Sequence, residues 1–241
     1  MIARCVDRAR RLRKDGGGLA AIEFALGAPM LMVLGGYGVE VANLAISNMR
    51  VSQYALQLAD NAARIGVNSG LSTFQVREAD INDVMQGLRL FSGNTDLGEH
   101  GRVTLSSLEN TQQTWDTAPA QRIHWQRCMG KRGGTTGGVD DTAYDSAYTT
   151  NKTDGTVAAK ANQGTDATSG IGPTGAKINA PTNSAVMFVE VNYEYQPLFG
   201  SLFIGKSRLH YTASAIVRDK RDLSQIASNS GTAATCDLHN A

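Results

Sequence analysis

The sequence predicts an α+β protein in which one long N-terminal helix packs on a small antiparallel β-sheet, with a long Thr/Gly-rich insertion. Three observations support this fold class. Residues 19–49 almost lack charged side chains, and apolar residues then recur at helical spacing over 51–65. Strand-like alternation follows in three later segments, 122–128, 185–195 and 208–217.

The overall composition argues against several classes of function. The chain has 241 residues and a formal net charge of +1, from 23 Lys and Arg against 22 Asp and Glu, so no nucleic-acid partner is expected. The three cysteines match no metal-binding or redox spacing, and the four histidines are scattered. We therefore expect no metal and no cofactor.

The N-terminal region is divided into a basic leader, residues 1–18, and a membrane-spanning segment, residues 19–48. The leader carries six basic and two acidic residues, whereas the only carboxylates of the following apolar run are Glu23 and Glu40. About 20 helical residues cross the ~30 Å hydrocarbon layer of a bilayer, so the run is long enough to span it. The positive-inside rule places the N-terminus in the cytoplasm and everything after about residue 45 outside.

Three interpretations of this segment are considered: a simple signal anchor, a cleaved secretory signal, and a pilin-type helix. Glu23 is the residue that favours the pilin-type helix. A carboxylate near mid-membrane costs about 2.5–3.5 kcal/mol on insertion scales, so it usually has a partner. Cleavage between Gly18 and Leu19 creates an amine that could serve as that partner. Glu40, about 25 Å further along the helix, is interpreted as an ordinary acid at the outer interface. Pro29 removes a backbone donor and is expected to bend the helix.

The heptapeptide at residues 18–24, Gly-Leu-Ala-Ala-Ile-Glu-Phe, resembles the prepilin peptidase site of type IV pilins. More narrowly, it is similar to the TadE-like pseudopilins of bacterial tight-adherence (Flp) pilus systems. The resemblance continues through Pro29 and Glu40 to the Ala-Ala-Arg sequence at 62–64. It implies a pilin-like fold, cleavage after Gly18, and pairing of Glu23 with the new amine of a neighbouring subunit.

The function that this resemblance implies is that of a minor pseudopilin, not an enzyme, which helps to initiate, scaffold or tip a tight-adherence type IV pilus used in adhesion. Its expected partners are prepilin peptidase, other pilins and pseudopilins, and the pilus assembly platform in the membrane. Its expected place is the bacterial inner membrane, in a single pass with the C-terminal domain periplasmic or extracellular. The alternative is a signal-anchored envelope enzyme or binding protein whose helix is only a tether.

The exported part is expected to contain a helical segment, residues 49–92, followed by a β-rich domain, residues 93–241. The long helix should continue to about residue 65, and a second helix is expected over about 73–91. Strands are expected at 103–108, 122–128, 185–195 and 208–217. In the second of these, Ile123, Trp125 and Arg127 alternate with His124 and Gln126, which indicates a half-buried strand. In the last, the alternate residues from Leu209 to Val217 are expected on one face.

Two connecting segments of this domain have unusual compositions. Residues 130–184 are mostly Gly, Thr, Asp, Asn and Ser, so they are interpreted as a long surface insertion without a core of its own, whose Tyr144 and Tyr148 could touch the domain. Residues 196–205 are apolar for a loop, and are expected under the long helix or on the membrane side.

Export also bears on the cysteines. Cys5 would leave with the leader, whereas Cys128 and Cys236 would both lie in an oxidising space. An intramolecular disulfide between the latter two is the simplest use, closing a loop of about 109 residues, with two independent thiols as the alternative.

Overall fold

The structure is a computed structural model that describes residues 17–68, 73–136, 139–227 and 231–239. The leader residues 1–16, including the basic cluster and Cys5, lie outside the described residues. The chain divides into two compact units, which are described separately. The first unit comprises the chain up to Ala45 together with Gln196–Lys206, and the second comprises Ile46–Tyr195 and Ser207–Ala241.

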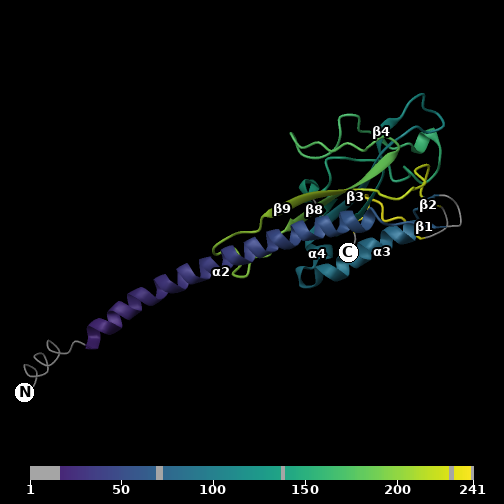
Figure 1. Cartoon of the computed structure of the whole chain (residues 1–241). Coiled ribbons are helices and arrows are strands. Elements are labelled where there is room, and N and C mark those ends of the chain that lie inside the picture. The colour runs from purple at the N-terminus through teal and green to yellow at the C-terminus, as the bar shows by residue number, and fades with distance from the viewer. Residues whose placement is uncertain (1–16, 69–72, 137–138, 228–230, 240–241) are drawn as a thin grey trace, which may run out of the picture. The chain divides into compact units, whose positions relative to one another are not determined.

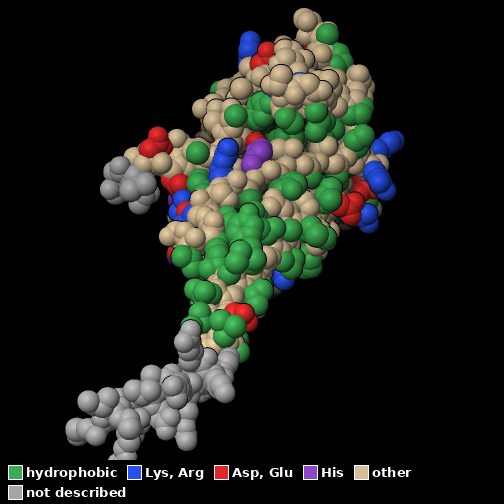
Figure 2. Space-filling model, turned by 90° about the vertical axis from the view of Figure 1, so that its left-hand side faces the viewer, with side chains coloured by type: hydrophobic (Ala, Val, Ile, Leu, Met, Phe, Trp, Pro, Cys, Tyr) green, Lys and Arg blue, Asp and Glu red, His purple; other side chains and the backbone are tan. Residues whose placement is uncertain are grey.

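The first unit is built on the apolar part of helix α2 (Gly17–Ala62), which is long enough and apolar enough to cross a membrane. None of its most apolar 18-residue window is buried. Figure 2 shows hydrophobic side chains gathered over the lower part of that view, with few charged groups among them. The helix continues on both sides of Pro29. The predicted long N-terminal helix is therefore present, and it ends three residues before Ile65.

The second unit is a mixed α+β domain with a helical layer and a five-stranded sheet (Figure 1). Its helices are α3 (Glu78–Ser92), α4 (Leu97–His100) and the part of α2 from Ile46 to Ala62, here called the outer part of α2. Short 3-10 turns lie at Gly93–Thr95, Thr142–Tyr144 and Lys160–Asn162. Its strands are β1 (Val67–Asn68), β2 (Phe74–Gln75), β3 (Gly101–Thr111), β4 (Ala120–Met129), β5 (Thr135–Thr136), β6 (Val139–Asp140), β7 (Thr165–Asp166), β8 (Ser184–Glu194) and β9 (Arg208–Ile216).

The main sheet has the order β7-β4-β3-β8-β9, and all its neighbouring strands are antiparallel. Strand β3 lies at its centre, paired with β4 on one side and β8 on the other. The four long strands occupy the segments expected from the sequence. Strands β3 and β4 extend beyond the expected bounds by one to three residues at each end, β8 lies one residue earlier than expected, and β9 ends one residue earlier.

One face of the sheet is covered by helices. The outer part of α2 buries its apolar stripe, including Tyr54 and Leu58, and α3 buries Ile81 and Met85. The Tyr54 hydroxyl contacts the backbone carbonyl of Ser92 at the end of α3, at 3.3 Å, which joins the two helices. The amphipathic spacing at 51–65 therefore marks a face that packs inside the second unit.

The opposite face is covered by the Thr/Gly-rich insertion, which lies at the surface of the domain and packs on the sheet through more residues than the two tyrosines named from the sequence. Ala167, Ile171 and Ala180 from the insertion form a buried cluster with apolar residues of β3, β4 and β8, among them Ile123 and Phe188. The insertion lies close to the sheet because it uses glycine at the contacts. A Cβ on Gly164, whose φ is +87°, would lie 2.1 Å from the carbonyl oxygen of Ile123. The small residues that disfavour an independent core thus permit close backbone packing.

Strand β4 does not follow the alternation expected from its sequence. Ile123, Trp125 and Arg127 were expected on one face, but Ile123 packs with the insertion while Arg127 contacts helix α3. A register shift opposite Ser107 and Leu108 causes this difference, because it places an extra residue in β4. Since both faces of the strand are buried, its prediction as half-buried is also wrong.

Helix α3 begins later than expected, because residues 74–75 form strand β2 instead of a first helical turn. Strand β2 pairs with β1 just after α2. Phe74 also donates its N–H to the carbonyl of Lys220, and its own carbonyl accepts the N–H of Asp222. These distant backbone partners hold the segment extended before the helix starts. In β9, by contrast, the alternation expected from Leu209 to Val217 is confirmed, with that face the more buried one.

The buried ion pair between Arg127 and Glu78 joins the sheet to α3. The Arg127 side chain is fully buried, and its Nε lies 2.9 Å from Oε2 of Glu78. We expect Arg127→Met to lower the free energy of unfolding by about 3–5 kcal/mol, because it leaves a largely buried carboxylate unpaired. The double variant Arg127→Met/Glu78→Met should recover most of that loss. Urea unfolding of the full chain in detergent measures both.

The matched control is the exposed pair of Lys131 and Glu99, whose side chains are about half exposed. Lys131→Met should cost no more than about 1 kcal/mol. A cost for Arg127→Met no larger than that of the control would contradict a structural role for the buried pair.

Candidate functional site

The residues predicted for cleavage and pairing lie along the first half of α2. Gly18 and Leu19 are in its first turns, Glu23 follows one turn later, and all three are exposed. Pro29 is also exposed. Glu23 makes no hydrogen bond or ion pair with any other residue that the structure describes. Its carboxylate therefore stands among exposed apolar side chains of the same helix.

Glu40 differs from its interpretation as an ordinary interfacial acid, because it is completely buried. Its carboxylate accepts the backbone N–H of Leu198 at 3.2 Å and that of Phe199 at 3.0 Å. Both donors belong to the loop between β8 and β9, which lies in the first unit with this part of α2. Hydrogen bonds to an ionised carboxylate are among the stronger ones in proteins. Glu40 therefore fixes the loop against the helix.

Aromatic packing holds the same loop on the neighbouring turn of α2. The Phe203 ring lies against Gly36, where a Cβ would approach it to 2.8 Å. Phe203 also makes edge-to-face contacts with Tyr37 and Phe199, at centroid distances of 6.3 and 5.6 Å. Glycine at position 36 thus makes room for the ring, a pairing that no local sequence pattern indicates.

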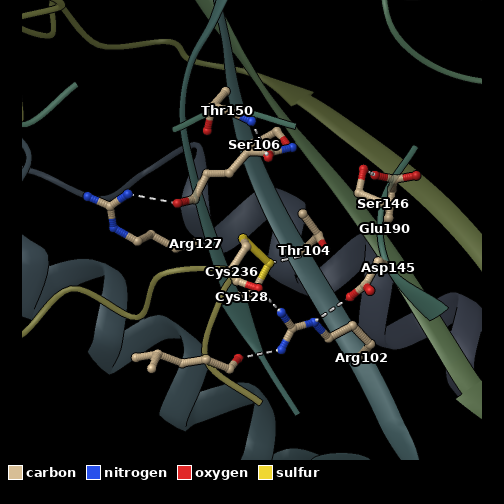
Figure 3. The surroundings of a disulfide bond; sticks show 12 residues. Arg102, Thr104, Ser106, Arg127, Cys128, Asp145, Ser146, Thr150, Glu190 and Cys236 are labelled. Atoms are coloured by element: carbon tan, nitrogen blue, oxygen red, sulfur yellow. Dashed lines mark hydrogen bonds and ion pairs between the residues drawn. A yellow bond between two sulfur atoms is a disulfide. The ribbon is translucent and has the colours of Figure 1, made fainter. Parts of the chain in front are cut away.

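In the second unit, Cys128 and Cys236, the pair expected from the sequence, form a disulfide (Figure 3). The bond joins β4 to the C-terminal segment. The backbone N–H of Cys128 also donates to the carbonyl of Ala234 at 2.8 Å, which supports the same attachment. The Thr104 hydroxyl lies 3.4 Å from Sγ of Cys128. The C-terminal segment is therefore tied to the sheet by covalent and backbone contacts.

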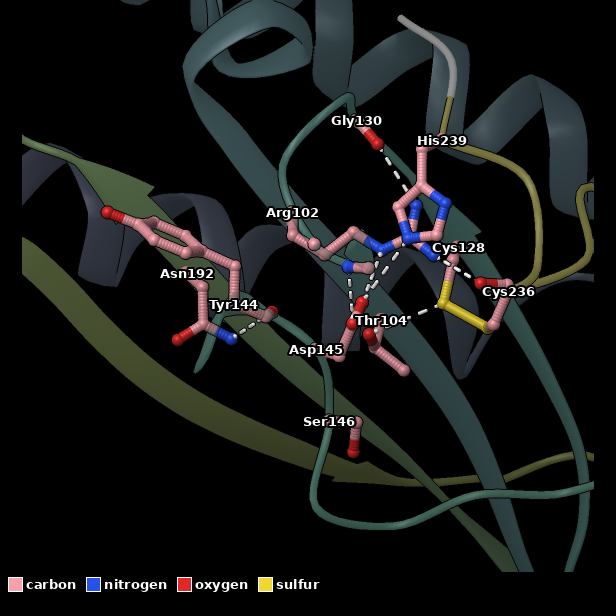
Figure 4. Close-up of polar contacts among 12 residues, drawn as sticks. Arg102, Thr104, Cys128, Gly130, Tyr144, Asp145, Ser146, Asn192, Cys236 and His239 are labelled. Carbon is pink, nitrogen blue, oxygen red and sulfur yellow. Dashed lines mark hydrogen bonds and ion pairs between the residues drawn. A yellow bond between two sulfur atoms is a disulfide. The ribbon is translucent and has the colours of Figure 1, made fainter. Parts of the chain in front are cut away.

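Arg102 of β3 adds a second attachment beside the disulfide (Figure 4). Its buried guanidinium donates to the carbonyls of Gly130 at 3.0 Å, Leu238 at 2.7 Å and Cys236 at 2.5 Å. Its Nε lies 3.5 Å from Asp145, which supplies the balancing charge. Arg102 was not singled out from the sequence, because it precedes the strand expected at 103–108 and no local pattern indicates its buried partners.

Two surface cavities, of about 370 and 280 Å³, lie beside the disulfide and share four lining residues: Gln126, Thr150, Cys236 and Asp237. Most of their lining residues are of polar types, and Gln126 is already bonded to Ser106 and to the backbone of Tyr148. Within the described ranges there is no cluster of three or more His, Cys, Asp or Glu side chains placed to hold a metal ion. The polar groups here serve mainly to join the insertion and the C-terminal segment to the sheet.

A second polar cluster, Ser107, Glu109 and His124, lies inside the domain. Glu109 accepts the Ser107 hydroxyl at 2.7 Å and lies 2.8 Å from Nδ1 of His124. In a catalytic triad the histidine stands between the serine and the acid. Here the acid stands between the other two, and all three residues are buried. This geometry gives the serine no base and gives a substrate no access.

Comparison of the chain with protein-family models, with curated proteins and with solved structures finds no match. The arrangement of the site therefore has to be interpreted from its own residues. These are an exposed apolar helix with one carboxylate unpaired within the described part of the chain, a loop fixed to that helix, and a disulfide-linked domain.

The pairing of His124 with Glu109 predicts a pH dependence of stability. Burial lowers the pKa of His124, but the charge of Glu109 and the hydrogen bond to it outweigh burial, and the net pKa is raised. Asp154 raises it further, and Arg122 opposes this. The stabilisation is therefore fully present below the unfolded pKa of about 6.5 and is lost as the pH rises through the folded value. Thermal melts of the full chain should show a melting temperature that falls above pH 6.5.

His124→Gln should flatten this decline. The matched control is His210→Gln, since burial lowers the pKa of His210 and its titration falls below pH 6.5. An unchanged decline in His124→Gln would show that another group is responsible.

Proposed function

We propose that this chain is a TadE-like minor pseudopilin, cut by a prepilin peptidase, that initiates, scaffolds or tips a tight-adherence type IV pilus. In this proposal the protein is not itself an enzyme. It inserts once into the bacterial inner membrane, with the N-terminus cytoplasmic and the disulfide-linked domain exported.

The observation that carries the proposal is the exposed apolar helix with Glu23 five residues after Gly18. A core helix of a soluble protein buries its apolar residues, whereas the most apolar window of α2 buries none. Because a carboxylate in a membrane usually has a partner, and Glu23 has none among the described residues, the partner is expected on another molecule.

The mechanism follows from these placements. Cleavage between Gly18 and Leu19 removes the leader and leaves an amine at the membrane boundary. The Glu23 carboxylate of one subunit then attracts the amine of its neighbour. At an effective dielectric near 20, opposite charges ~4 Å apart attract by about 4 kcal/mol before desolvation, so the net coupling is smaller. The apolar surface of α2 packs against other pilin helices and orients the domain outward.

The first test is the mature N-terminus. Mass spectrometry of the protein from membranes should find Leu19 as the first residue. Gly18→Val should leave the full-length precursor, since a branched side chain does not fit a pocket for a small residue. Gly17→Val is the matched control and should still be cut. Normal shortening of Gly18→Val would contradict cleavage by a prepilin peptidase. A mature chain that still begins at Met1 would favour the signal-anchored alternative.

The second test concerns pairing. Glu23→Gln keeps the size of the side chain but removes the charge, so the protein should insert and be cleaved yet lose cross-links to partner pilins and impair piliation. Glu23→Asp, which keeps the charge on a shorter side chain, should retain more cross-linking than Glu23→Gln. Wild-type cross-linking and piliation in Glu23→Gln would exclude the amine-pairing mechanism, whatever the cleavage result.

A further inference from the structure

The loop Gln196–Lys206 exposes large apolar side chains next to the apolar helix. Leu198 is 61% exposed, Phe199 46% and Leu202 74%, within a loop of only eleven residues. A connection between two strands normally carries polar side chains at its surface. These exposed side chains therefore indicate that the loop meets an apolar environment.

The loop is held in a fixed place on α2. Glu40 accepts two consecutive backbone N–H groups of the loop, and the side-chain amide of Asn43 lies 3.5 Å from the carbonyl of Gln196. The Phe203 ring lies on Gly36 one helical turn away. Contacts on both turns, polar on one and aromatic on the other, make the position of the loop along the helix well defined.

That position corresponds to the outer boundary of a bilayer, if the helix enters the membrane at Leu19 as the proposed function requires. At 1.5 Å per residue, Gly36 lies about 26 Å and Glu40 about 32 Å beyond Leu19. The hydrocarbon layer is ~30 Å thick. The Phe203 contact therefore falls just inside the hydrocarbon and the Glu40 contact at its edge.

Three N–H groups of the loop are bonded in a way that suits this depth. Irregular backbone is costly at the edge of the hydrocarbon unless its N–H groups are bonded within the protein. The N–H groups of Leu198 and Phe199 go to Glu40, and that of Leu202 goes to the carbonyl of Phe199 at 3.4 Å. The same contacts shield the Glu40 carboxylate, which would otherwise be costly to place near lipid.

We propose that Gln196–Lys206 is a lipid-inserting loop, whose Leu198, Phe199 and Leu202 side chains enter the boundary between headgroups and acyl chains of the outer leaflet. Its occupant is the bilayer and not a second protein, because the exposed side chains continue the exposed apolar surface of α2 at the same level, where Val39 and Val41 are 51% and 41% exposed. The loop then gives the exported domain a second membrane contact besides the helix.

The test places a tryptophan at position 202 in the full-length chain, reconstituted in phosphatidylcholine/phosphatidylglycerol vesicles with brominated acyl chains. The emission of the parent protein, from Trp115 and Trp125, is subtracted. Leu202→Trp should show blue-shifted emission and a several-fold larger loss of intensity than the matched control Val157→Trp, an exposed position in the second unit. Leu198→Trp gives a second reporter in the same loop.

Equal loss of emission at positions 202 and 157 overturns the proposal. Blue-shifted emission that brominated lipid does not quench also overturns it, because protein then covers the loop. Val33 is an exposed residue in the middle of the predicted membrane-spanning segment, residues 19–48. Val33→Trp therefore distinguishes failure of the lipid-inserting loop from failure of the proposed function. Quenching at 33 without quenching at 202 refutes only the lipid-inserting loop, whereas no quenching at 33 refutes membrane insertion itself.

Discussion

The central strands of the sheet are buried on both faces, so each charged side chain that they carry inward needs a partner inside the domain. Arg102 binds carbonyls of the C-terminal segment, and Arg127 pairs with Glu78 at the start of α3. Arg221, after the last strand, donates to the carbonyls of Ala62 and Ile65 at the end of α2. Because an unpaired buried charge is costly, each arginine holds one peripheral segment in place. The layers of the second unit are thus connected by their buried charges as well as by apolar packing.

The same burial explains how a chain with 6% aromatic residues builds a stable domain. The insertion covers one face with small residues, and Gly164 lets its backbone lie almost against β4. This cover has few large side chains, so it depends on hydrogen bonds such as that of Gln121 with the carbonyl of Ala167. The disulfide between Cys128 and Cys236 limits how far the unfolded chain can separate, which compensates for the modest core.

Two carboxylates of helix α2, Glu40 and Glu23, differ in burial and in hydrogen bonding. Glu40 is buried and receives two backbone N–H groups from within the chain, whereas Glu23 is exposed and has no partner in the described residues. A carboxylate satisfied internally secures the fold, and one left for another molecule can take part in assembly. This contrast connects the architecture of the first unit with the proposed role in a pilus, because of these two carboxylates only Glu23 is exposed and has no partner among the described residues.

The sequence by itself determined the features that depend on local periodicity: the long helix, the α+β class, the four long strands and the buried face of β9. It also indicated which cysteines could pair, since only two follow the apolar segment. The tertiary structure alone decided the register shift in β4, the extended backbone at Phe74 and the burial of Glu40. Each of these depends on backbone or side-chain partners that lie far away in the chain. In addition, a strand that is buried on both faces lacks the alternation from which its orientation is predicted. Periodicity reports which face of a segment is apolar, whereas the partner that covers it is fixed only when the whole chain packs.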